Sequence, residues 1–125
     1  MRVGYVHFAF LGPESYWAAE ASECAAEQEQ FWEYHAAIYA NQRGENQGAL
    51  NKDNLKAFAA ALNLDTENFN ACLDSGRYTA VVQSDASIAQ TLGVRSTPTF
   101  LLNGQPLVGG QPFEVFQQYI EALLP

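Results

Sequence analysis

The pattern of hydrophobic and polar positions divides the chain into three parts, and the first is a short alternating segment. Residues 3 to 11 read VGYVHFAFL and alternate with period two, which is typical of a strand. Both faces of this segment carry bulky side chains, so we expect a strand covered on both sides. Gly12 and Pro13 follow, and Pro13 suits the first position of a helix.

The second part, from about residue 14 to residue 92, has helical spacing of its apolar residues. Glu14 to about Asn41 predicts a helix with one break near residues 28–30, and the polar segment 42–50 predicts a loop. Three further helices are expected: one that Asn51 or Asp53 caps, one from Asp65 to Gly76, and one from about Arg77 to Leu92 that ends at Gly93.

The third part has the pattern of a hairpin followed by a helix. Residues 94–109 hold two short apolar runs separated by Asn103-Gly104, a strong hairpin signal. An amphipathic helix is expected after Pro112, with Phe113, Phe116 and Ile120 on one face. The pattern therefore predicts an α/β fold of one strand, a block of helices, a hairpin and a final helix.

Length and charge narrow the possible partners. A chain of 125 residues fits a single domain, here 1–125 with the helical block at about 13–92. The formal charge of −8 opposes binding to nucleic acid or to anionic lipid. No apolar run approaches the roughly 20 residues of a membrane span, and the first residues lack the features of a signal peptide. The sequence leaves the compartment undetermined.

Residues 93–104 narrow the choice of fold family. GVRSTPTFLLNG, residues 93–104, has a Thr-Pro pair just before an apolar strand and an Asn-Gly turn. It resembles the Thr-Pro segment of thioredoxin-fold proteins. PESYWAAEASECAAEQEQFWEYHAAIYANQ, NLKAFAAALNLD, FNACLDSGRY and QPFEVFQQYIEALL are similar, in order, to segments of the DsbA-like disulfide oxidoreductases. The resemblance implies a thioredoxin fold with a helical insertion, a cis peptide bond at Pro98, and a backbone at Thr97 that pairs with an extended peptide substrate.

The chain departs from that family at the catalytic unit. The family carries a Cys-x-x-Cys after its central strand, at the start of a helix that lowers the pKa of the nucleophile. This sequence has no Cys-x-x-Cys and begins after the point where that unit belongs. We therefore expect an N-terminally truncated, partial thioredoxin-like fold with a short mixed sheet of the first strand and the hairpin. No catalytic residue can be assigned. Exposed strand edges would favour completion of the sheet in a homodimer, and a fragment of a longer enzyme is the alternative.

The two cysteines, Cys24 and Cys72, allow three interpretations. They are a structural disulfide between two helices, a buried pair of free thiols, or a working redox couple. The family resemblance implies the first. No Lys, Arg or His adjoins either cysteine in sequence, which opposes the third.

Metal and cofactor sites are not expected. His7 and His35, even with the cysteines, match no zinc spacing, and phosphate-loop and dinucleotide patterns are missing. The aromatic residues from Tyr16 to Tyr34 are expected to pack the helices, and exposed members among them would offer an apolar patch.

Two functions follow from these observations. In the first, the chain belongs to the thiol–disulfide oxidoreductases, whose resemblance implies a parent that acts on cysteines of exported proteins, and this chain is expected to lack redox catalysis of its own. The second is a non-catalytic peptide-binding or dimeric assembly module. The sequence does not decide whether the chain is an enzyme, and the family parent is expected outside the cytoplasm.

Overall fold

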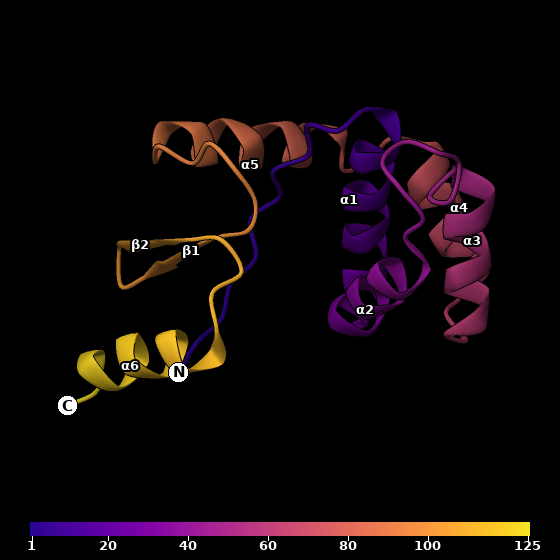
Figure 1. Ribbon diagram of the computed structural model, residues 1–125. Helices are drawn as coiled ribbons and strands as arrows, with labels where there is room; N and C mark the ends of the chain where they lie inside the picture. Colours follow the sequence, from indigo (N-terminus) through magenta and orange to yellow (C-terminus); the bar gives the residue numbers. More distant parts are fainter. The chain divides into compact units, whose positions relative to one another are not determined.

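The computed structural model describes residues 1–125, which form six helices and two strands (Figure 1). The helices are α1 (Pro13–Ala26), α2 (Phe31–Asn41), α3 (Lys52–Ala61), α4 (Thr66–Asp74), α5 (Thr79–Thr91) and α6 (Phe113–Leu123), and the strands are β1 (Thr99–Leu102) and β2 (Gln105–Val108). The chain separates into unit 1, Met1–Ser87, and unit 2, Ile88–Pro125, with the boundary inside α5. That the two units form one domain stays a prediction.

The ends of the helices in unit 1 follow from local chemistry. Pro13 occupies the first turn of α1, where its missing N–H costs no hydrogen bond. The predicted break between the first two helices is confirmed, and Glu29 there has a φ of 59°. Asn51 and Asp65 cap α3 and α4 by accepting hydrogen bonds from the backbone N–H groups of Asn54 and Asn68. The sequence therefore placed these boundaries within one or two residues.

Helices α1 to α4 surround the core of unit 1 (Figure 1). Three alanines of α1 are buried: Ala18, Ala21 and Ala25. Their small side chains permit a close approach of α1 to the neighbouring helices, which contribute Tyr34, Leu55 and Phe69 as fully buried side chains. The hydroxyl of Tyr34 donates a hydrogen bond of 2.8 Å to the backbone oxygen of Leu55, so its polar end is satisfied inside the core.

The strand predicted over residues 3–11 is wrong. Residues 1–10 form no strand, and the only sheet contains β1 and β2. A strand requires a neighbour that accepts its ladder of backbone hydrogen bonds, and no strand of this chain pairs with the segment. Of residues 1–10 only His7 is buried, so the expected cover on both sides is not present either. The sheet is therefore antiparallel and two-stranded, not mixed.

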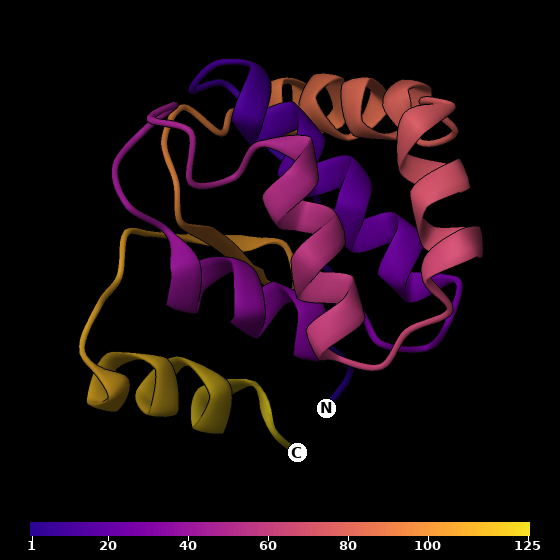
Figure 2. The same ribbon diagram turned by 90° about the vertical axis from the view of Figure 1, so that its right-hand side faces the viewer.

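Unit 2 consists of the end of α5, the hairpin and α6. Gly93 ends α5 with a φ of 83°, and the backbone N–H of Val94 donates to the oxygen of Ala89, which is a Schellman arrangement. Asn103 and Gly104 both have positive φ, so the predicted two-residue turn is confirmed. The hairpin and α6 lie alongside each other in both views (Figure 2), and Phe100 contacts Phe116 with ring centroids 4.8 Å apart.

Candidate functional site

The two cysteines of the chain form a disulfide inside unit 1. Cys24 of α1 and Cys72 of α4 are bonded, with Cα atoms 5.9 Å apart, and each is 1% exposed. Each cysteine lies on the buried side of its helix, together with the other buried residues of α1 and α4, so both side chains point into the core. There is no free cysteine, so no thiol is available as a nucleophile while this bond is intact.

The Thr97–Pro98 segment lies in unit 2, between α5 and β1. Its peptide bond is cis, and both residues are exposed. Two hydrogen bonds hold the segment against the hairpin: the Gly109 N–H donates to the Pro98 oxygen at 2.8 Å, and the Thr99 hydroxyl donates to the Ser96 oxygen at 2.7 Å. The Thr97 residue itself is therefore presented to solvent on a segment whose two flanks are anchored.

The backbone of β1 has one free side. The Gly109–Pro98 bond makes these two residues a hydrogen-bonded pair, and bonded and non-bonded pairs alternate along an antiparallel ladder. Thr99 opposite Val108 and Leu101 opposite Pro106 are thus non-bonded pairs. The N–H and C=O groups of Thr99 and Leu101 point away from β2. Pro106 lacks an N–H and fits the outer side of an edge strand, so β1 is the strand with the complete set of outward donors.

His7 is a buried polar group of unit 1 whose partners no sequence pattern predicted. The ring Nε2 lies 2.7 Å from Glu23 Oε1, and the backbone N–H donates to Asp85 Oδ2 at 3.0 Å. The side chain is 4% exposed. Its ring also contacts those of Tyr5 and Phe31. The histidine therefore joins α1 and the first half of α5 to the N-terminal segment, a role that period-two alternation could not reveal.

A second cluster surrounds Glu27, at the end of α1. Tyr78 donates to Glu27 Oε1 at 2.7 Å, and the Arg77 guanidinium binds both carboxylate oxygens at 2.8 Å. The hydrogen bonds from Tyr78 and Arg77 hold the pKa of the Glu27 carboxyl below its ordinary value. The hydrogen bond to Glu27 raises the pKa of Tyr78. This cluster ties α1 to the segment between α4 and α5 and stabilises unit 1.

Other polar features of unit 1 do not assemble a reaction centre. A cavity of about 570 Å³ is bordered by Trp17, Glu20 and Lys52, among others. The Thr79 hydroxyl is hydrogen-bonded to Glu20, and the Lys52 ammonium lies 5.7 Å from the centre of the Trp17 ring. No three His, Cys, Asp or Glu side chains are grouped as a metal would require.

None of the helices has the length and apolar character needed to cross a membrane.

The residues singled out from the sequence thus fall into two separate places. Cys24 and Cys72 come together within unit 1, and Thr97 and Pro98 adjoin one another within unit 2. The redox-couple interpretation of the cysteines would require an accessible sulfur, and both are buried. The aromatic residues divide: Tyr34 is fully buried, whereas half of Trp32 is exposed.

Comparisons with known proteins agree with this architecture. A family model described as Thioredoxin matches residues 2–122. Over 105 residues the chain is 36% identical to the Na(+)/H(+) antiporter NhaA of Herminiimonas arsenicoxydans, covering 84% of this chain and 16% of that protein. It is 29% identical over 108 residues to the Probable disulfide bond formation protein D of Bacillus cereus, covering 83% of this chain and 50% of that protein.

A solved structure has the same fold. The thioredoxin-like oxidoreductase from Silicibacter pomeroyi DSS-3 aligns with a TM-score of 0.78 and 24% identity, covering 94% of this chain and 65% of that one. The chain therefore spans half or less of the length of these two curated relatives and about two thirds of the solved structure.

Proposed function

The chain belongs to the thioredoxin family, and from that premise we propose that it is a peptide-binding module of the DsbA-like thiol–disulfide oxidoreductases without redox catalysis of its own. Exchange between thiols and disulfides needs a thiolate that attacks a disulfide sulfur. The observation that carries the proposal is that both cysteines of the chain are buried and bonded to each other. The Cys24–Cys72 bond is then a structural link between α1 and α4.

The exposed Thr97–Pro98 segment supports the binding half of the proposal. An extended peptide of a protein substrate would pair with the backbone at Thr97, as the family resemblance implies, and continue toward the outward groups of Thr99. Backbone pairing suits a module that accepts unfolded chains of varied sequence, because backbone hydrogen bonds do not depend on the identity of the side chains. The substrate class is therefore an extended polypeptide segment.

Substitution at Thr97 tests this binding mode. Thr97→Pro removes the backbone N–H, and the loss of one hydrogen bond should weaken the binding of an unfolded peptide about five-fold. Thr97→Val keeps the N–H and the side-chain shape, so it should bind like the parent chain. Titration of the reduced, alkylated insulin B chain, followed by nuclear magnetic resonance shifts of residues 95–99, measures both. Equal affinity of the two variants, or shifts confined to other residues, would contradict the proposal.

The free side of β1 favours a second candidate function, that of a dimeric assembly module. Unpaired N–H and C=O groups on an edge strand are a template for another strand. In a homodimer the β1 strands of two copies would pair through Thr99 and Leu101, whose groups point away from β2. Leu101→Pro removes an outward donor and no bond within the hairpin. Light scattering should find a dimer for the parent chain and a monomer for this variant, and a parent monomer at millimolar concentration would exclude the dimer.

A further inference from the structure

Five ring side chains of unit 1 meet on one surface, which we call the aromatic face: Tyr5, Phe31, Trp32, His35 and Tyr39. The Tyr5 ring lies 5.2 Å from Phe31, 6.0 Å from Trp32 and 5.3 Å from His35, between centroids. His35 and Tyr39 are 4.8 Å apart. Burial, with a contribution from Tyr39, raises the pKa of Tyr5 to about 12, so the phenol stays neutral at physiological pH.

The aromatic face arises from the spacing of residues on α2. At 100° per residue, positions 31, 32, 35 and 39 cover one side of the helix, about 100° wide, while Tyr34 turns into the core. The helix therefore has two apolar sides, and only one is covered. Tyr5 is 42% exposed, Trp32 50% and Tyr39 66%. A group of exposed aromatic side chains of this kind marks an interaction site.

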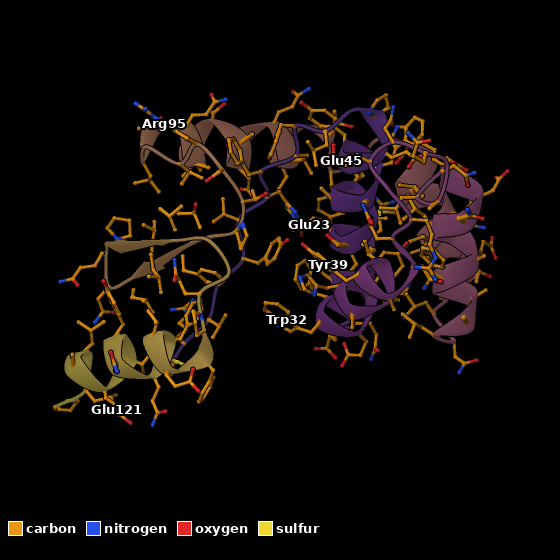
Figure 3. All side chains as sticks on the ribbon, in the orientation of Figure 1. Glu23, Trp32, Tyr39, Glu45, Arg95 and Glu121 are labelled. Atoms are coloured by element: carbon orange, nitrogen blue, oxygen red, sulfur yellow. A yellow bond between two sulfur atoms is a disulfide. The ribbon has the colours of Figure 1, made fainter.

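Charge limits what the aromatic face can bind. Residues 13–41, which form α1 and α2, contain six glutamates and neither lysine nor arginine. Glu23 and Asp85 flank His7 beside the rings of Tyr5 and Phe31. Glu33 follows Trp32 and is exposed. Figure 3 shows Glu23, Trp32 and Tyr39 on the same side of unit 1. Arg77 pairs with Glu27 and His7 with Glu23, but the two helices keep an excess of negative charge because they contain no lysine or arginine of their own.

We propose that the aromatic face of unit 1 binds a basic peptide segment whose arginine side chains stack on Trp32 and Tyr39. A guanidinium is attracted to the face of an aromatic ring and also pairs with carboxylates through a planar set of donors. The rings lie on α2, and Glu23 binds His7 through Oε1 only, which leaves its second carboxylate oxygen as an acceptor on this side of unit 1. A second copy of the chain fits poorly, because it would bring another acidic surface against this one.

This inference goes beyond the proposed function, since it concerns a different surface and a different ligand chemistry. The Thr97–Pro98 segment belongs to unit 2 and would bind the backbone of a peptide. The aromatic face belongs to unit 1 and would bind positively charged side chains. The two can fail independently.

The test uses the full chain and a capped decapeptide of alternating arginine and glycine. A matched peptide with citrulline in place of arginine keeps the shape and loses the charge. Calorimetry should detect binding of the arginine peptide only, and binding should weaken as salt is added. Trp32→Ala combined with Tyr39→Ala should weaken it about ten-fold, since each ring at an exposed site contributes roughly two- to five-fold. Phe113→Ala, a change at an exposed ring of unit 2, should have no effect.

Several results would overturn the inference. They are equal binding of the citrulline peptide, equal binding by the double variant, or an absence of binding by the parent chain. Retention of charge in the double variant makes it a control for non-specific attraction to an acidic protein. Thr97→Pro should leave arginine-peptide binding unchanged, so loss of the proposed function would not be mistaken for loss of this site. Circular dichroism verifies that each variant is folded.

Discussion

At the scale of single residues, a buried polar group stabilises the fold only when it has a hydrogen-bond partner. Tyr34 is fully buried, and its hydroxyl donates to the Leu55 oxygen. Burial raises the pKa of this phenol, so it remains protonated and able to donate. Tyr34→Phe should lower the free energy of unfolding by about 1 kcal/mol in urea titrations. Tyr16→Phe, at a 41% exposed position, should change it little, and equal effects of the two would contradict the assignment.

Glu27 makes the stability of unit 1 depend on pH. Its pKa is lowered in the folded chain from the ordinary value of 4.5, so the folded state binds fewer protons than the unfolded state in acid. The stabilisation is therefore present above about pH 4.5 and lost as the pH falls through the folded-state pKa. Glu27→Gln should lower the melting temperature at pH 7, and the difference from the parent should shrink toward pH 3. Glu29→Gln, with no such partners, serves as the control.

At the scale of elements, the disulfide joins α1 and α4 across a sequence separation of 48 residues. Closing a loop of that length reduces the entropy of the unfolded chain by an amount worth about 4 kcal/mol. Cys24→Ala with Cys72→Ala should lower the free energy of unfolding by that order, as measured by urea denaturation with and without reductant. The parent chain should resemble the variant only after reduction. A loss below 1 kcal/mol would show that the bond is not structural.

Elements with local signals could be predicted from the sequence. The side chains of Asn51 and Asp65 cap the first turns of α3 and α4, Gly93 ends α5 through its positive φ, and Asn103-Gly104 sets the hairpin turn. The segment 3–11 has equally clear alternation, yet a strand depends on a partner elsewhere in space. The aromatic face could likewise not be predicted, because helical spacing does not distinguish a helix side that packs against a neighbour from one that stays exposed.

The candidate site was predictable only in part. Thr97 and Pro98 were found through a resemblance, and the pairing of Cys24 with Cys72 was one of three interpretations that spacing left open. The contacts of His7 with Glu23 and Asp85 come from residues 16 and 78 positions away. Such contacts depend on the packing of α1 and α5, which no local pattern encodes.

At the scale of the whole molecule, the chain has a thioredoxin-like fold, and the proposed lack of redox catalysis rests on the state of its two cysteines. The family model covers residues 2–122, while the two cysteines are committed to a buried bond. We propose two binding surfaces, the Thr97–Pro98 segment of unit 2 and the aromatic face of unit 1. We therefore expect this chain to hold polypeptides rather than to oxidise them.

The most direct test of that account is the reduction of insulin by dithiothreitol with the 125-residue chain added. We predict that turbidity develops at the rate of dithiothreitol alone, and that the variant Cys24→Ala with Cys72→Ala behaves like the parent. A rate above that background which disappears in the variant would contradict the account, since it would make Cys24 and Cys72 a working redox couple.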